Sequence, residues 1–187
     1  MHRIFTSLVL SVIPFSGNHA AAPVDKQISM NLRMVHIEKD FTAVTRGFEV
    51  ETGMINVAEI LKLTQEGAAA ETIKATIEQQ LDGKKIAIFT KLPMGLLYST
   101  LKGNPKQAMK YSVGNPFPAM ELLSMNNSAA SFVPLTVNIY ADGTGTVIEY
   151  LVPSTVIQHI STEEQANIIG ELLDSELDRI IAKIQSE

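Results

Sequence analysis

The chain contains no cysteine. Catalysis by a thiol nucleophile is therefore excluded, and so are iron–sulfur clusters and zinc sites ligated by cysteine. A lipid anchor attached to a cysteine behind an N-terminal signal is excluded for the same reason. Any site in this protein must be built from other side chains.

Positive charge and long apolar runs are also scarce. Lysine and arginine total 15 against 20 acidic residues, so the net charge is −5. Electrostatic binding of nucleic acid needs basic side chains on phosphates, so we expect no nucleic-acid partner. Beyond residue 15 no apolar run reaches the ~18 residues of a membrane-spanning helix, so we expect no membrane span. The Gly-rich loop and nucleophile-elbow patterns of phosphate-binding and hydrolytic sites are missing too.

The first residues have the pattern of a secretory signal. Arg3 precedes the apolar stretch 4–15, and small residues follow at 16–22. This pattern predicts a signal peptide over 1–21, with cleavage after Ala20 or Ala21, and a periplasmic or secreted protein. The alternative is a buried N-terminal helix. Loss of Arg3 with the signal would change the net charge from −5 to −6.

Two segments show the periodicity of amphipathic helices. Residues 66–83 carry one apolar stripe and end at Gly83, a typical helix terminator. The C-terminal segment carries a longer stripe that starts near Ser161 and Glu164, a capping-box spacing. Its members are Ile169, Leu173, Leu177, Ile181 and Ile184. A helix of about twenty residues is about 30 Å long, enough to cross a whole sheet.

Alternating apolar residues predict strands over 84–90, 107–113, 134–140 and 146–152, the last two forming a hairpin. Short helices are expected over 92–103 and 115–125. In the second of these, Asn115 is placed to cap the helix and Pro116 occupies its first position.

The N-terminal part of the mature chain is harder to interpret. Loose alternation over 28–38 and 41–51 predicts two strands, which we interpret as an added edge hairpin within an extension spanning 22–53. Residues 54–63 fit a strand or a helix.

The order of elements predicts an α+β fold. We expect a mostly antiparallel curved sheet with helices on one face and the long C-terminal helix packed across it. With 45% hydrophobic and 19% charged residues, the chain suits one globular domain over 54–187.

The region 111–143 resembles domain-of-unknown-function family 302. The matching positions are Gly114-Asn115-Pro116, Val133-Pro134-Leu135 and Tyr140-Ala141-Asp142-Gly143, and the resemblance extends over 55–184. It implies a fold like that of the TATA-box-binding protein. The family has cysteines at two of these positions, where this chain has Gly114 and Leu135. No metal or thiol role of those cysteines can therefore carry over, and the family brings no agreed activity.

Candidate functional residues are few. His36 and His159 have no partner at metal-ligand spacing, and the methionines near the family motif fit core filling better than a copper site. We therefore expect no cofactor, no metal site and no catalytic residue identifiable from sequence. Candidate ligand-binding residues are Tyr111, Asn115, Asn138, Tyr140 and Glu149.

Three functions remain open. The favoured one is a non-catalytic module that binds a small apolar ligand or serves as an accessory protein, because a sheet closed by a long helix can enclose an apolar cleft. A homodimeric protein-interaction module is the first alternative. An enzyme with a carboxylate-based site around Glu149 is the second.

Overall fold

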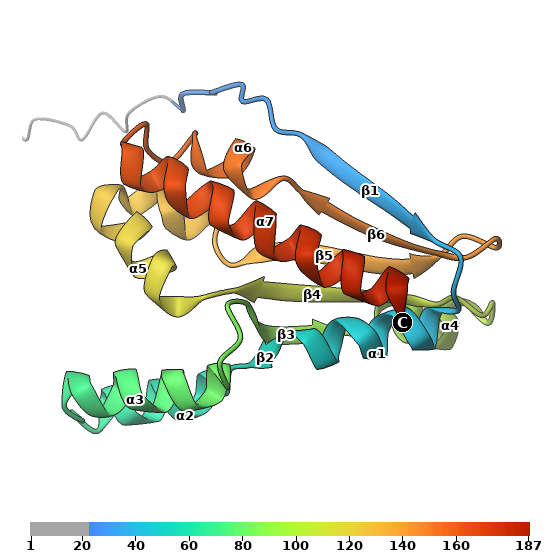
Figure 1. Ribbon diagram of the computed structural model, residues 1–187, viewed down its shortest axis with the longest axis horizontal. Coiled ribbons are helices and arrows are strands. Elements are labelled where there is room, and N and C mark those ends of the chain that lie inside the picture. The colour runs from blue at the N-terminus through green and yellow to red at the C-terminus, as the bar shows by residue number, and fades with distance from the viewer. Residues whose placement is uncertain (1–22) are drawn as a thin grey trace, which may run out of the picture.

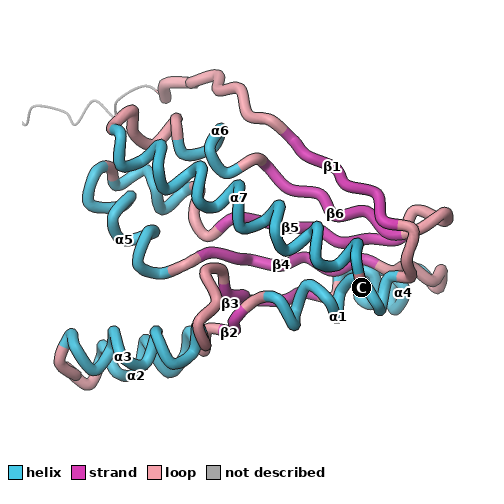
Figure 2. Tube along the Cα trace, viewed as in Figure 1, coloured by secondary structure: helices cyan, strands magenta, loops and turns pink. Residues whose placement is uncertain are grey.

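Six strands form a single open sheet in the order β1-β6-β5-β4-β3-β2 (Figures 1 and 2). The computed structural model describes residues 23–187, so the expected signal peptide lies outside the described residues. The strands are β1 Leu32–Ile37, β2 Gly53–Met54, β3 Ala87–Leu92, β4 Ala108–Gly114, β5 Leu135–Ala141 and β6 Thr146–Leu151. Only the β2–β3 pair is parallel, and the other neighbours are antiparallel.

Seven α-helices and one 3-10 helix accompany these strands in the described region. They are α1 Phe41–Glu51, α2 Val57–Gln65, α3 Ala70–Leu81, α4 Met94–Lys102, α5 Pro116–Met125, η1 Asn127–Ser131, α6 Pro153–Ile157 and α7 Glu164–Ser186. None of the helices described over 23–187 is long and apolar enough to cross a membrane. The predicted α+β architecture is confirmed.

The core lies between one face of the sheet and the helices α1 and α7, which cross it in Figure 1. All five apolar positions predicted for the C-terminal stripe are buried. The opposing sheet face contributes inward side chains from the central strands, spaced two residues apart as strand geometry requires. These side chains are Tyr111, Val113, Val137, Ile139, Ile148 and Tyr150.

Residues 41–51 correct the sequence prediction, because they form helix α1 and not a strand. The Asp40 side chain accepts a hydrogen bond from the Ala43 N–H at 2.9 Å and so caps the helix start. Val44 and Phe48 are fully buried and lie four residues apart, which places them on one helical face. The expected edge hairpin is therefore an edge strand, β1, followed by a helix that returns over the core.

The start of α7 also differs from the expected capping box. The N-cap is Glu163, and no side chain caps the helix. The Ser161 hydroxyl instead accepts a hydrogen bond from the Glu163 N–H at 3.2 Å, before the helix begins. The helix is held by the burial of its apolar stripe, which matters more than a single cap.

Helices α2 and α3 form a hairpin that projects from the β2–β3 edge of the sheet (Figure 1). A small second core joins it to the body through Ile55, Ile77, Leu81 and Ala87. Phe89 and Phe117 pack against this second core from the body. Helix α2 itself has no buried residue.

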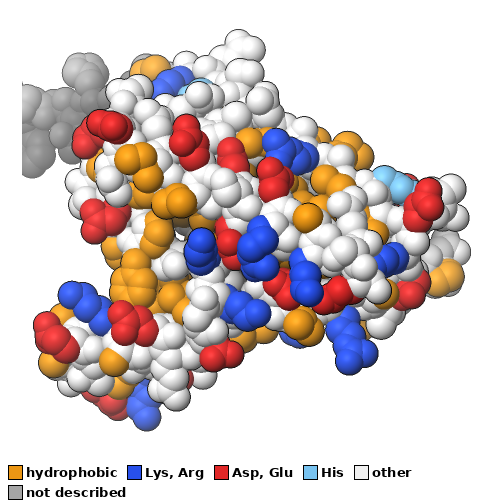
Figure 3. All heavy atoms as spheres, in the orientation of Figure 1, with side chains coloured by type: hydrophobic (Ala, Val, Ile, Leu, Met, Phe, Trp, Pro, Cys, Tyr) orange, Lys and Arg blue, Asp and Glu red, His pale blue; other side chains and the backbone are white. Residues whose placement is uncertain are grey.

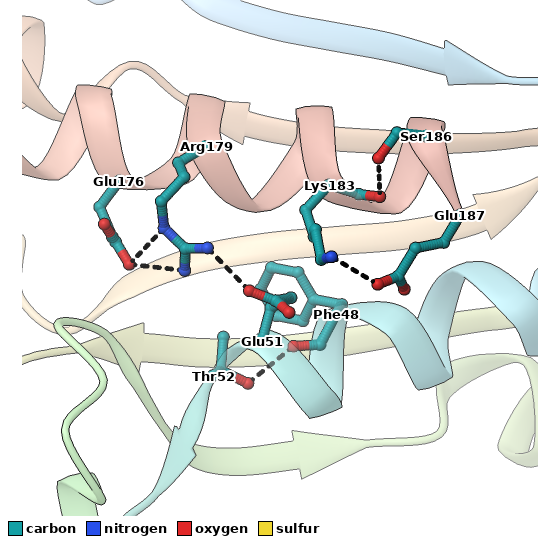
Figure 4. A network of polar contacts seen from close by, with 8 residues as sticks. All are labelled: Phe48, Glu51, Thr52, Glu176, Arg179, Lys183, Ser186 and Glu187. Carbon is teal, nitrogen blue, oxygen red and sulfur yellow. Dashed lines mark hydrogen bonds and ion pairs between the residues drawn. The ribbon is translucent and has the colours of Figure 1, made fainter.

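A charged cluster fastens α7 to the end of α1 (Figure 4). The Arg179 guanidinium donates to Glu51 Oε2 at 2.7 Å and to Glu176 Oε1 at 2.8 Å. The Glu176 side chain is only 7% exposed. Hydrogen bonding from Arg179 is the main cause that lowers the pKa of Glu51, and the two carboxylates in turn raise the pKa of Arg179.

Replacing Arg179 with methionine should destabilise the fold by about 1–3 kcal/mol at neutral pH, because Glu176 would stay buried without its charged partner. The Glu51 contribution is present above pH 4.5, its ordinary pKa, and is lost as the pH falls through the lowered folded-state value. The deficit of Arg179→Met should therefore shrink in acid. Urea unfolding across pH measures this, with Arg46→Met on the exposed side of α1 as the control. A deficit that is constant with pH would contradict the account.

Candidate functional site

The corner between β4 and α5 is built by the motif Gly114-Asn115-Pro116. Asn115 is the N-cap of α5, and its side-chain oxygen accepts a hydrogen bond from the Phe117 N–H at 3.0 Å. Its amide nitrogen donates to the Lys85 carbonyl at 3.0 Å, just before β3. One side chain therefore fixes both the start of α5 and the approach to the neighbouring strand, as the sequence predicted for the cap.

Behind this corner lies an apolar cavity of about 240 Å³. Its walls come from Phe89 of β3, from the C-terminal end of β4, from α5, from the segment leading into β5, and from α7. The lining residues are Phe89, Val113, Gly114, Asn115, Pro116, Pro118, Ala119, Met120, Leu122, Leu123, Ala130, Val133, Pro134, Leu135 and Leu173. Asn115 is the one polar side chain among them.

The cavity has a buried floor and an exposed rim. Val113 and Leu122 are fully buried at the floor. Met120, Ala130 and Pro134 are exposed at the rim, so the cavity opens to solvent between α5 and the segment before β5. Met120 is a flexible, unbranched side chain that can adjust to a molecule entering there.

A second hollow of about 210 Å³ adjoins the cavity along α7. The two share Asn115, Pro118 and Leu173, and the second also reaches Lys85 and Glu176. Figure 3 shows hydrophobic side chains running from α7 down towards the α2–α3 hairpin on this side of the molecule. The apolar surface therefore continues from the cavity to a charged edge.

Both positions at which the family resemblance expects cysteine lie in the cavity wall. Val113 pairs with Leu135 across the β4–β5 ladder, and Gly114 follows directly. In this chain Gly114 has no side chain at the first position and Leu135 has an isobutyl side chain at the second, so the wall has no thiol. The replacement makes the cavity more apolar and leaves space beside Gly114.

The sequence-predicted site residues do not form one site. Asn115 lies at the cavity. Tyr140, Asn138 and Glu149 lie together on the exposed face of the sheet, where the Tyr140 hydroxyl donates to Glu149 Oε2 at 3.1 Å. Partial burial is the main cause that raises the pKa of Tyr140, and the hydrogen bond to Glu149 raises it further.

Tyr111 points to the opposite face and belongs to the core. Its ring packs against Phe48 with the ring centres 5.1 Å apart, and its hydroxyl donates to Glu49 at 2.9 Å. Burial is the main cause that raises the pKa of Tyr111 well above its ordinary value. Tyr111 therefore does not share a sheet face with Asn138 and Tyr140.

Within residues 23–187, no group of three or more histidine, aspartate or glutamate side chains is arranged to hold a metal ion. His36 lies near Thr144 and Asp142 at the β5–β6 turn, and His159 bonds the Ser29 carbonyl at 2.7 Å. Each histidine therefore contacts a neighbouring part of the fold. The candidate site residues that the sequence does not predict are the apolar ones around the cavity, whose only sequence signal is the pair of prolines Pro116 and Pro134.

The sheet, the long C-terminal helix and the cavity define an α+β protein with an open antiparallel sheet and an apolar site at the β4–α5 corner. The sequence profile of domain of unknown function DUF302 matches residues 54–184, and the chain belongs to this family. Among curated proteins no match was found.

A solved structure with the same fold is the crystal structure of an uncharacterized conserved DUF302 protein from Bacillus stearothermophilus. It has a TM-score of 0.57 and 14% sequence identity, and the match covers 83% of this chain and 99% of that one. At this identity the likeness concerns the fold alone. The N-terminal strand β1 and the whole of α1 lie outside the residues that the family profile matches.

An alanine at position 114 should be tolerated and should raise the stability by about 0.5–1 kcal/mol, since glycine weakens a strand. Its Cβ would lie 3.6 Å from Phe89 Cε2 and 3.8 Å from Pro134 Cβ, which are ordinary contacts. The matched control is Gly95→Ala, whose Cβ would lie 2.4 Å from the Lys106 carbonyl oxygen and should destabilise. Urea unfolding compares them. Equal loss in both variants would mean that position 114 has no free space.

Proposed function

We propose that this protein is a non-catalytic module that binds a small apolar molecule in the cavity behind Asn115. The proposal rests on the apolar character of the cavity wall. Asn115 is its one polar side chain, and both the oxygen and the nitrogen of that amide already have backbone partners. A charged or strongly polar ligand would lose its hydration there without finding replacement hydrogen bonds.

The size of the cavity limits the ligand. An engineered apolar cavity of about 150 Å³ is known to bind benzene, and drug-sized sites begin near 300 Å³. At about 240 Å³ the cavity suits one or two fused rings, or a short branched hydrocarbon. A ligand with one polar end could leave that end at the rim, towards Lys85 in the adjoining hollow.

Naphthalene is a suitable probe for this site. It should bind the wild-type protein and raise its melting temperature, and Ala119→Leu should weaken binding at least tenfold because the larger side chain occupies the cavity. Calorimetry and thermal unfolding measure these effects. The matched control is Ala75→Leu on the exposed side of α3, which makes the same change away from the cavity. Equal binding by the two variants, or no binding by the wild type, would refute the proposal.

The two alternative functions draw on other parts of the molecule. A carboxylate-based enzyme would use Glu149 and Tyr140 on the exposed sheet face, where Met34 of β1 lies beside Glu149 and is 58% exposed. A homodimer would use a sheet edge or face. We rank both below ligand binding, because neither Glu149 nor Tyr140 lines the apolar cavity or the hollow that adjoins it.

Export forms part of the proposal, supported by the signal-like pattern over 1–21. Expression in a Gram-negative bacterium should give a periplasmic protein that begins at Ala21 or Ala22. Cell fractionation followed by intact-mass measurement tests this expectation. Substituting Ala20 and Ala21 with larger residues should block processing and keep the precursor mass. A cytoplasmic protein with the full mass of the wild-type chain would contradict export.

A further inference from the structure

Helix α4 exposes the apolar side that an amphipathic helix normally buries. Met94, Leu97, Tyr98 and Leu101 follow the spacing i, i+3, i+4, i+7, so they form one stripe along the helix. All four are exposed, with Leu101 at 79% and Leu97 at 45%. Leu92, at the end of β3, and Leu96, on another side of α4, are also exposed.

The side of α4 that faces the protein is small and polar. Gly95 is the one buried residue of the helix, and it packs directly on the backbone at Lys106 and Ala108. Ser99 donates to the Gly95 carbonyl and accepts from the Lys106 N–H at 2.9 Å. These contacts fix the rotation of α4, so the apolar stripe cannot turn inward without losing them.

In the sequence, the segment that contains α4 carries only positive charge. Residues 83–120 contain six lysines and no acidic residue, in a protein whose net charge is −5. Lys102 ends the helix, and the Lys106 ammonium lies 5.0 Å from the centre of the Tyr98 ring. Of the four lysines at positions 91–110, Lys91 pairs with Glu49 at 3.0 Å. Lys102, Lys106 and Lys110 have no ion pair within residues 23–187.

We propose that α4 is a docking surface for an anionic lipid membrane. Leucine, methionine and tyrosine side chains on one side of a helix enter the boundary between headgroups and acyl chains, and lysines beside them bind anionic headgroups. Tyr98 suits this boundary because its ring is apolar and its hydroxyl is polar. The attachment is peripheral, since the nine residues of α4 are too few to span a bilayer.

The same charges disfavour a second copy as the occupant of this surface. Two α4 helices paired about a two-fold axis would bring both lysine sets within about 14 Å, the length of the helix at 1.5 Å per residue. Like charges at that distance repel, whereas an anionic surface attracts them. The rest of the acidic chain is repelled by such a surface, so the lysine-rich end would face it.

This site is separate from the ligand cavity. Helix α4 packs where β4 begins, at Lys106 and Ala108, and the cavity lies where β4 ends, at Val113 and Gly114. Variants of α4 should therefore leave naphthalene binding unchanged. The two proposals can fail independently of each other.

Vesicle sedimentation tests the proposal with the protein as isolated from the exporting cell, so that every variant has the same N-terminus. The wild type should sediment with vesicles of equal parts phosphatidylglycerol and phosphatidylcholine, and much less with phosphatidylcholine alone. Salt should weaken the binding. Leu97→Glu with Leu101→Glu should reduce the partition coefficient at least tenfold, and Lys102→Gln with Lys106→Gln should reduce it about fivefold for each lysine.

The matched control is Val57→Glu with Leu61→Glu on α2, where both apolar side chains are also exposed. It should bind vesicles like the wild type. All variants replace exposed residues, and an unchanged melting temperature verifies their fold. Failure of the wild type to bind anionic vesicles at low salt would overturn the proposal, and so would equal loss in the α2 control. A dimer in solution that Leu97→Glu with Leu101→Glu dissociates would also overturn it, in favour of a second copy.

Discussion

The hydrogen bonds of Asn115 hold together the part of the molecule on which the proposed function depends. Strand β4 ends, and α5 begins, within the three residues Gly114-Asn115-Pro116. The Asn115 amide joins the first turn of α5 to the Lys85 carbonyl, so the helix cannot move away from the start of β3. Because the chain turns so abruptly, α5 stands at the end of the strands and leaves a space in which Asn115 is the one polar lining side chain.

The two ends of β4 differ in chemistry. At its C-terminal end the protein encloses apolar surface in a cavity, and at its N-terminal end it exposes apolar surface on α4. The cavity borders the core, because Val113, Leu122 and Leu135 belong to the core and also line the cavity. The apolar stripe of α4 takes no part in the core. Cavities and exposed apolar stripes both forgo stabilising burial, so they are features for which a function is to be sought.

The sequence predicts the elements whose hydrophobic period is long and regular. The α7 stripe is confirmed because five buried positions repeat at helical spacing, and the alternation in β4 and β5 is confirmed because each strand has one buried face. The strand prediction for residues 41–51 is wrong, because Val44, Phe48 and Val50 fit the even spacing of a strand although the segment is a helix capped by Asp40. A short segment often fits both periods.

The candidate site was predictable only in part. The cap at Asn115 follows from local chemistry, so sequence was sufficient. The sheet face on which Tyr111 lies depends on the register of β4 against β5, and of β5 against β6. Only the pairing of the strands in the folded sheet determines these registers. The cavity is assembled from four separate stretches of the chain, and no local sequence pattern indicates a space between them. The outward rotation of α4 follows from the packing of Gly95, a tertiary contact.

The central claim is that the space behind Asn115 is a preformed apolar cavity. A crystal of the protein under xenon pressure tests this most directly, because xenon occupies dry apolar cavities. We expect a strong xenon peak between Phe89, Leu122 and Leu135. Ordered water in that space, or the absence of xenon there while xenon binds elsewhere in the same crystal, would contradict it.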